Sequence, residues 1–214
     1  MRAYHFTSNE HALDNLRNKR MKIATIGDMN DPFELLGMNL RDKEARKKFR
    51  SWRDDMASDY GFMCFSRNWH NPLLWSHYGD KHSGVCLGFD LSDEHLIDVI
   101  YTGSRIQLPN GVLNQAKGAD QIMQRLLSAK YTDWAYEDEV RVFCDLADPD
   151  AKSGRYFSGF GDTIALKEVI AGPLCKTTAE QFRDVIEDQS VKLIKSRLAF
   201  KSYRIVKDKR GFKA

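Results

Sequence analysis

The chain has 214 residues, of which 42% are hydrophobic and 29% charged, and its formal net charge is +3. This composition is ordinary for a globular chain that buries a core, and we expect a single domain over residues 1–214. No apolar run approaches the roughly 20 residues that a membrane span needs. The N-terminal residues also lack the apolar stretch of a signal peptide, so the cytoplasm is the expected location.

The four cysteines are far apart in the sequence, and three of them lie in apolar runs (Cys64, Cys86 and Cys144). This pattern is typical of buried thiols rather than of a disulfide framework or a zinc site. The charge is less even. Segment 192–214 contains nine basic residues and one acid, and therefore carries +8, whereas residues 1–191 carry −5. Such a segment binds phosphates or nucleic acid, or it is a solvated end that aids solubility.

Hydrophobic periodicity predicts elements that alternate irregularly along the chain. In chain order we expect a strand (4–7), two helices (9–18 and 41–58), a strand (61–66), a helix (71–79), a strand (84–90), a short helix from residue 92, a strand (99–101), a helix (114–129), two strands (139–145 and 163–171), a helix (177–188) and a closing strand (203–206). No glycine-rich phosphate-binding motif follows a strand, so neither a Rossmann nor a P-loop site is supported. The order predicts an α+β fold whose central sheet of short strands is mixed or mostly antiparallel, with flanking helices.

Two polar groups stand out in the first 34 residues. On the first strand, alternation places His5 and Thr7 on one face, where they either hold the edge of a ligand or form a satisfied pair at a sheet edge. Further on, Asn30 and Asp31 precede Pro32, and this is a pattern that starts turns. These two side chains therefore either cap the turn or belong to a polar site.

An aromatic and histidine-rich segment follows in the middle of the chain. Trp75 and Tyr78 are three residues apart on a predicted helix, and His77 lies between them. This spacing puts both aromatic rings on one side, either as part of the core or as a ledge on which a planar ligand stacks. The density of histidine and serine around them favours a functional interpretation.

A third polar group opens the strand at 139–145. Glu137, Glu139 and Arg141 share one face, while Val140 and Val142 lie on the other. An ion pair between Glu139 and Arg141 is one explanation of the pattern. A carboxylate that stabilises a cationic transition state at the edge of a cleft is another. Metal-binding motifs such as HExxH and paired CxxC are absent, as is the GxSxG motif of hydrolases, so we assign no metal ligands.

Taken together, these motifs resemble the bacterial family called domain of unknown function 2971. The resemblance covers roughly residues 4–172 and gives no activity by itself. It is carried by Tyr-His-Phe-Thr (4–7), Asn-Asp-Pro-Phe-Glu (30–34), Cys-Phe-Ser (64–66), Trp-Ser-His-Tyr-Gly (75–79), His-Ser-Gly-Val-Cys-Leu-Gly-Phe-Asp (82–90), Tyr-Glu-Asp-Glu-Val-Arg (136–141) and Lys-Glu-Val-Ile-Ala-Gly (167–172).

A second resemblance is to the NAD-consuming ADP-ribosyltransferase fold, through the His-x-Thr word of the first strand and the Glu-x-Glu word of a late one. It implies that His5 and Thr7 hold the nicotinamide ribose or amide and that Tyr78 or Tyr101 stacks on the nicotinamide. It further implies that Glu139 is the catalytic acid. The remaining residues of the implied site are Glu137, which steers the acceptor, and Asn30, Asp31, Ser66, Trp75, His77 and Arg141, which contact the nucleotide.

The sequence departs from that fold's pattern, because no Ser-Thr-Ser word follows the middle strand and the Trp-Ser-His-Tyr segment has no counterpart there. The implied chemistry is nonetheless coherent. Cleavage of the nicotinamide–ribose bond creates an oxocarbenium-like centre, which a carboxylate on the ribose 2′-hydroxyl stabilises. A positive charge from Arg141 would keep Glu139 ionised.

Three functions are therefore weighed. The first is ADP-ribosyl transfer or NAD hydrolysis, with a toxin or phage-defence role that modifies nucleic acid or protein following by analogy alone. The second is a nucleotide- or nucleic-acid-binding regulatory module without turnover, which uses Trp75, Tyr78 and the basic segment. The third is a nuclease or nucleotide hydrolase that uses Asp31, Glu34 and Glu137 with Mg²⁺.

Overall fold

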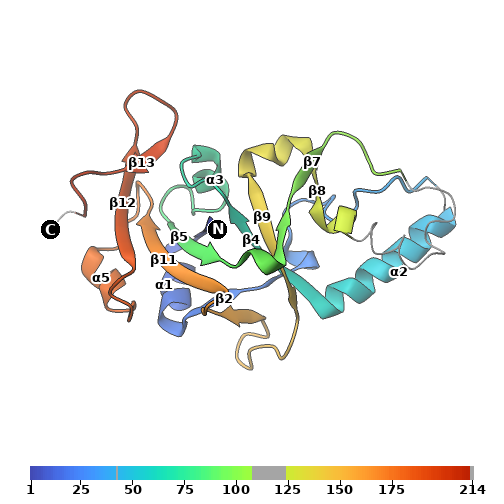
Figure 1. Cartoon of the computed structure of the whole chain (residues 1–214), viewed down its shortest axis with the longest axis horizontal. Helices are drawn as coiled ribbons and strands as arrows, with labels where there is room; N and C mark the ends of the chain where they lie inside the picture. Colours follow the sequence, from blue (N-terminus) through green and yellow to red (C-terminus); the bar gives the residue numbers. More distant parts are fainter. Residues whose placement is uncertain (42, 108–123, 213–214) are drawn as a thin grey trace.

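The computed structural model describes residues 1–41, 43–107 and 124–212. Figure 1 shows the elements in sequence colours. The α-helices include α1 (Asn9–Asn18), α2 (Lys43–Asp59), α3 (Pro72–His77) and α5 (Ala179–Arg183), and the 3-10 helices include η1 (Ile26–Asp28), η2 (Asp93–His95) and η4 (Thr132–Glu137). The strands are β1 (Arg2–Thr7), β2 (Arg20–Lys22), β3 (Ala24–Thr25), β4 (Tyr60–Ser66), β5 (Val85–Leu91), β6 (Leu96–Asp98), β7 (Ile100–Thr102), β8 (Ala129–Tyr131), β9 (Glu139–Asp145), β10 (Phe157–Gly159), β11 (Ile164–Ala171), β12 (Lys192–Leu198) and β13 (Ile205–Lys207).

The central sheet has the strand order β13-β12-β11-β5-β1-β4-β9-β6, with β3 paired to β4 beside this path. All of its pairs are antiparallel except β11 with β12. This arrangement confirms the predicted α+β fold with a mostly antiparallel central sheet. None of the helices in the described part of the chain is long and apolar enough to cross a membrane.

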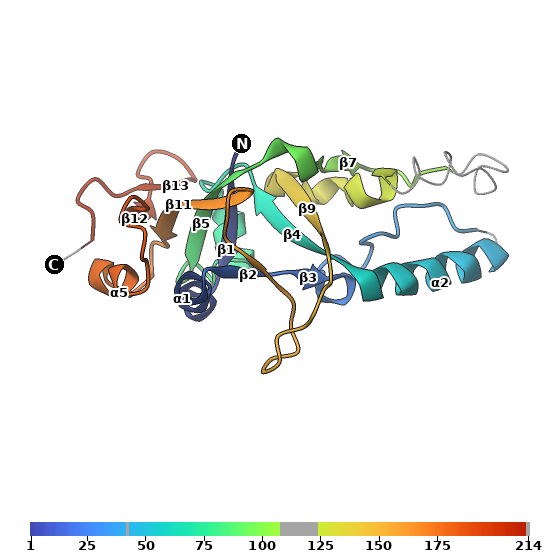
Figure 2. The ribbon, with the colours of Figure 1, turned by 60° about the horizontal axis from the view of Figure 1, so that its bottom comes forward.

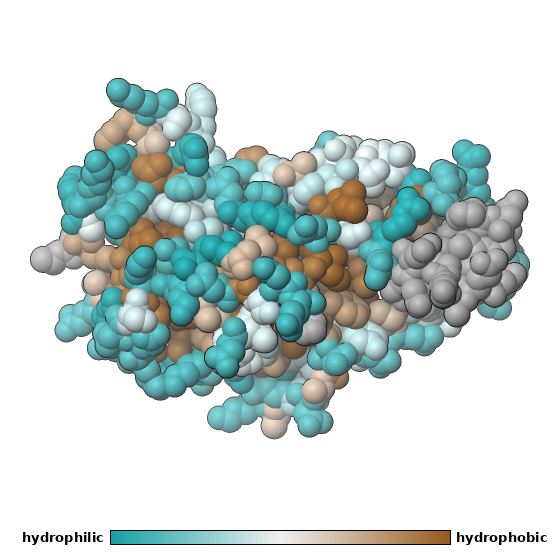
Figure 3. Space-filling view, viewed as in Figure 1, coloured by the Kyte–Doolittle hydropathy of each residue, from teal (hydrophilic) through white to brown (hydrophobic). Residues whose placement is uncertain are grey.

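The core lies on both faces of this sheet because the strand residues alternate between them. On one face, Leu87 and Val169 pack against Leu16 of α1 and Phe182 of α5, and Figure 2 places these two helices on the same side of the strands. On the other face, Cys86 packs in a cluster with the aromatic residues around α3. In the view of Figure 3, hydrophilic residues cover most of the surface, and hydrophobic ones show mainly between them near the middle.

Local sequence explains where the helices α1 and α3 begin. Ser8 caps α1, since its hydroxyl accepts from the backbone N–H of His11 at 3.2 Å. Asn71 caps α3 in the same way, through the N–H of Leu73 at 2.9 Å, and Pro72 occupies the first helical position. The short helix α3 therefore starts where the sequence predicts, and it carries Tyr78 at its C-terminal end.

The secondary structure of the C-terminal part of the chain, from residue 177 onward, differs from the predicted elements. The predicted helix at 177–188 is shortened to α5, and the residues that follow form β12, an unpredicted strand parallel to β11. The lysines of β12 interrupt the apolar alternation from which a strand would be predicted. Lys195, however, donates to the carbonyl oxygens of Gly172 and Cys175, both at 2.8 Å, and Ser196 donates to that of Ala171 at 2.7 Å. Much of the predicted helix at 114–129 lies outside the described residues.

Candidate functional site

Strand β9 lies beside β4, which lies beside β1, so the polar groups of the sequence come together across three neighbouring strands. Glu139 stands opposite Ser66 in the register of β4 and β9. Along β9, Val140 packs into the main core, whereas Arg141 and Phe143 face the other way and lie against Phe62. The predicted division of β9 into two faces is confirmed.

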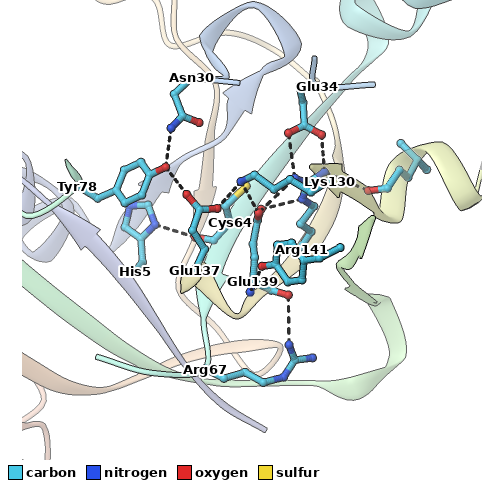
Figure 4. A network of polar contacts seen from close by, with 12 residues as sticks. His5, Asn30, Glu34, Cys64, Arg67, Tyr78, Lys130, Glu137, Glu139 and Arg141 are labelled. Atoms are coloured by element: carbon cyan, nitrogen blue, oxygen red, sulfur yellow. Dashed lines mark hydrogen bonds and ion pairs between the residues drawn. The ribbon is translucent and has the colours of Figure 1, made fainter. Parts of the chain in front are cut away.

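A buried chain of alternating charges begins behind this strand (Figure 4). The guanidinium of Arg141 is fully buried and donates to both carboxylate oxygens of Glu34, at 2.7 and 3.0 Å. Its Nε also donates to Oε1 of Glu139 at 2.7 Å. The ammonium of Lys130, from β8, donates to Oε2 of Glu139 at 2.7 Å and contacts Oε2 of Glu137 as well. Three carboxylates thus share two buried cations.

This network of buried charges shifts the pKa values of Glu137 and Glu139 in opposite directions. Burial opposes ionisation of Glu139, but Arg141 and Lys130 outweigh it and hold the pKa of Glu139 at about 2. For Glu137, burial dominates over the attraction of Lys130, and the pKa lies above its ordinary value. Burial also opposes the charge on Lys130, yet the two carboxylates raise its pKa overall. Glu139 is therefore a fixed anion, and Glu137 is the carboxyl group that gains a proton more readily.

Both glutamates line a cavity of about 190 Å³. Its walls come from β1, β4, the loop around Asn30 and the end of α3. At one side, the hydroxyl of Tyr78 donates to Oε1 of Glu137 and accepts from Nδ2 of Asn30 at 2.5 Å. Burial and the nearby Glu137 raise the pKa of Tyr78 well above its ordinary value, so this hydroxyl stays protonated. The same wall thus presents a carboxylate, a phenol and an amide to the cavity.

His5 lies at another wall of the cavity. Its Nδ1 is 3.0 Å from the carbonyl oxygen of Cys64, which only accepts hydrogen bonds, so Nδ1 carries the proton. Burial lowers the pKa of His5 and keeps the ring neutral. The Nε2 atom of this neutral ring is therefore left as a hydrogen-bond acceptor.

The cavity gathers many of the predicted site residues. Its lining includes His5, Asn30, Ser66, Tyr78, Glu137 and Glu139. The hydroxyl of Ser66 is partly used locally, since it donates to the carbonyl oxygen of Asn68 at 3.0 Å. These residues come from positions 5 to 139 of the chain, and the sheet brings them to one place.

Other predicted residues do not line this cavity. Trp75 is fully buried against Phe6, with ring centroids 5.1 Å apart, and belongs to the core rather than to a stacking ledge. Asp31 is buried and accepts from the N–H of Phe33 at 2.8 Å, as the turn motif predicts. Arg141 lies behind Glu139. His77 is exposed beside Tyr78, and Thr7 ends β1; neither is part of the lining.

Lys130, the residue that joins the two glutamates, is not predicted from the sequence. One lysine among 33 basic residues carries no motif that would distinguish it. Tyr101 has a different position from the one expected, because its hydroxyl accepts from the backbone N–H of Glu139 at 2.8 Å and does not reach the cavity lining. Burial raises the pKa of Tyr101 to about 12. This hydrogen bond holds the first residue of β9 in place, and the ring of Tyr101 does not stack on a ligand in the cavity.

The carboxylates of the proposed magnesium site are engaged elsewhere. Asp31 caps its turn, Glu34 pairs with Arg141, and Glu137 contacts Lys130 and Tyr78. Over residues 1–41, 43–107 and 124–212, no group of three or more His, Cys, Asp or Glu side chains is placed to hold a metal ion.

Comparison with known proteins gives one match. The model of the family described as "Protein of unknown function (DUF2971)" matches residues 74–142, about a third of the chain. That segment contains Tyr78, Glu137, Glu139 and Arg141 of the site. No curated protein and no solved structure matches the chain. Over the matched segment, the chain is similar to this family, whose description gives no function.

Proposed function

We propose that the cavity binds the nicotinamide end of NAD and that the protein consumes NAD, by ADP-ribosyl transfer or by hydrolysis. The observation that carries the proposal is the meeting of His5, Tyr78 and the Glu137–Glu139 pair around one cavity. A neutral imidazole and a phenol can form hydrogen bonds with the amide and hydroxyl groups of a nicotinamide riboside, and a carboxylate can stabilise positive charge on its ribose. At about 190 Å³, the cavity is smaller than the roughly 300–1,000 Å³ of drug-sized sites, and only one end of a dinucleotide fits inside it.

The contacts favour a division of labour between the two glutamates. The resemblance to ADP-ribosyltransferases assigns catalysis to Glu139, but both of its carboxylate oxygens are held by Arg141 and Lys130. Glu137 has one oxygen on Lys130 and the other on the hydroxyl of Tyr78. A ribose 2′-hydroxyl that displaces the Tyr78 hydroxyl would occupy that second oxygen. We therefore place Glu137 on the ribose and Glu139 behind it, where it fixes Lys130.

The proposed step is balanced without a further reactant. The bond from ribose C1′ to the nicotinamide nitrogen breaks, and its electron pair neutralises the pyridinium ring, so nicotinamide leaves as a neutral molecule. The cationic ribose is stabilised by the carboxylate of Glu137. A hydroxyl group of an acceptor, or water, then bonds to C1′ and releases its proton to Glu137.

The test is incubation of purified protein with NAD⁺ labelled in the ADP-ribose part, alone and with DNA, RNA or cell lysate, with nicotinamide release measured in parallel. Glu137→Gln should abolish release, and Glu139→Gln should reduce it. Glu94→Gln, at an exposed position outside the cavity, is the matched control and should leave it unchanged. Release that is equal in the Glu137→Gln variant and the control would remove Glu137 from the mechanism.

One observation favours a second function, namely nucleotide binding without turnover. All four carboxylate oxygens of Glu137 and Glu139 already have donors. A site with this arrangement holds a ligand through its phenol, amide and imidazole groups and needs no change in the buried charges. NAD⁺ binding in calorimetry without any nicotinamide release would establish this function and end the catalytic proposal.

In this second function, nucleic acid would bind outside the cavity, on the loop between β12 and β13. The loop between β12 and β13 projects beyond the rest of the sheet in Figure 1. Phe200 and Tyr203 on this loop are 91% and 98% exposed, and the guanidinium carbon of Arg197 lies 4.7 Å from the centroid of the Phe200 ring. Exposed aromatic rings among cations are the features on which single-stranded nucleic acids stack. The test is to measure oligonucleotide binding at several salt concentrations. Binding that weakens with salt and is lost in the double variant Phe200→Ala/Tyr203→Ala would support this role.

A further inference from the structure

A second hollow, of about 520 Å³, lies between α2 and the loop that leads into it. Figures 1 and 2 both show this loop running outward from the sheet beside α2, which then returns towards β4. Five arginines line the hollow, here named the arginine groove: Arg41, Arg46, Arg50, Arg53 and Arg105. None of its lining residues belongs to the cavity that holds Glu137.

Helical spacing concentrates the positive charge on one side of α2. Arg46, Arg50 and Arg53 follow one another at intervals of four and three residues, so they lie on one face of the helix. Phe49 is buried on this face and forms part of the lining. The acidic residues of α2 do not line the groove.

Among residues 1–41, 43–107 and 124–212, the guanidinium groups of the groove have no acidic partner: no carboxylate in these ranges lies within 4.0 Å of any of the five. Arg46 instead donates to the carbonyl oxygens of Leu40 and Arg41, at 2.9 and 2.7 Å. The Nε atom of Arg53 is buried and has no hydrogen-bond partner in the described part of the chain. Gathered cations with spare donors are balanced most readily by a bound anion with several charges.

We propose that the arginine groove binds an oligophosphate, that is, a chain of two or three linked phosphates, either free or as part of a nucleotide. Guanidinium groups donate two parallel hydrogen bonds to phosphate oxygens, and five of them around one hollow match an anion of several charges. A single orthophosphate would engage only part of the set. The ligand enters a hollow bounded by a helix and a loop, which suits a compact phosphate chain better than an extended polymer.

The test is titration calorimetry of the whole protein with inorganic triphosphate, ATP, orthophosphate and a twelve-nucleotide single-stranded DNA. Triphosphate should bind at least tenfold more tightly than orthophosphate. The double variant Arg46→Gln/Arg50→Gln, at two exposed positions, should weaken triphosphate binding by about a hundredfold, since each charged hydrogen-bonding group accounts for roughly tenfold or more. Tighter binding of ATP than of triphosphate would identify a nucleotide, and equal binding a free phosphate chain.

The matched control is Lys47→Gln/Lys48→Gln, which removes the same charge from exposed positions on the same helix outside the groove. Its dissociation constant for triphosphate should stay within about threefold of that of the natural protein, because exposed charges outside a site contribute little. Thermal unfolding should show that both double variants are folded. An equal loss of affinity in both would show attraction to net charge only and overturn the proposal. So would the absence of triphosphate binding, or tighter binding of the DNA with the same dependence on Arg46 and Arg50.

Discussion

Lys130 and Glu139 form a buried ion pair of 2.7 Å, although they belong to strands that are not paired with each other. The same ammonium contacts Glu137, so a single cation separates two carboxylates that would otherwise repel each other in a medium of low dielectric constant. This pair explains how the site keeps two glutamates at one cavity. The stability of the protein should therefore depend on Lys130.

Replacing Lys130 with Met should leave Glu137 and Glu139 buried beside each other with Arg141 as their one remaining cation among these contacts. Removal of one partner from a buried ionic group typically costs about 3–5 kcal/mol, and we expect a loss in this range in the free energy of urea unfolding at pH 7. The loss should shrink at pH 5, where a carboxyl group is protonated more readily.

The control for this prediction is Lys47→Met, at an exposed position of α2, which should change the unfolding free energy by no more than about 0.5 kcal/mol. A Lys130→Met variant as stable as this control would show that the buried charges need no central cation.

Acid should destabilise the protein through Glu139. Its folded pKa of about 2 is below the ordinary value of 4.5, so the ionised form is favoured by folding. The resulting stabilisation is fully present above about pH 5 and is lost as the pH falls towards 2; for one such group it is of order 3 kcal/mol. Glu137, with its raised pKa, acts in the opposite sense. The unfolding free energy of the natural protein should therefore fall more steeply below pH 5 than that of Glu139→Gln, and parallel curves would contradict the assignment.

The hydroxyl of Tyr78 should matter more to Glu137 than to the fold. Tyr78→Phe removes a donor to Oε1 of Glu137 and an acceptor for Asn30, and we expect a loss of about 1–2 kcal/mol. Because this hydrogen bond lowers the pKa of Glu137, its removal should raise that pKa further. Carboxyl carbon chemical shifts recorded against pH would show the change. Tyr203→Phe, at a fully exposed ring, is the control and should leave the titration of Glu137 unaltered.

The sequence predicts those elements whose apolar residues repeat regularly. The bounds of α1 agree with the prediction, and those of β4, β5 and β9 differ by no more than a residue at each end. The strand β12 escaped prediction because its half-buried Lys195 is accommodated by hydrogen bonds to the loop that follows β11. That compensation depends on contacts between distant segments and leaves no pattern in the local sequence.

Part of the site is predictable from the local sequence. The pairing of Glu139 with Arg141 follows from their spacing on one strand. Glu34, 107 residues from Arg141, and Lys130 join the network through the fold alone. The burial of Trp75 likewise follows from packing against Phe6, which the helical spacing of the aromatic residues does not reveal.

The turn after α3 should be intolerant of a side chain at Gly84. A Cβ atom there would lie 2.3 Å from the carbonyl oxygen of Thr7 and 2.8 Å from the backbone of Gly79. These are backbone atoms in a hydrogen-bonded turn, since the N–H of Gly84 donates to the carbonyl oxygen of Gly79 at 2.8 Å, and they cannot rotate away. Gly84→Ala should therefore destabilise the protein by about 1–3 kcal/mol or more, as overpacking does.

Gly161→Ala provides the comparison, because a Cβ atom at Gly161 would meet nothing within 4 Å. Its effect should stay within about 0.5 kcal/mol, as for other surface substitutions. Tyr78 immediately precedes this turn, so the strain of Gly84→Ala should also disturb the contact between Tyr78 and Glu137. If Gly84→Ala unfolds at the same urea concentration as Gly161→Ala, the turn is looser than its backbone contacts indicate, and it does not fix the position of Tyr78.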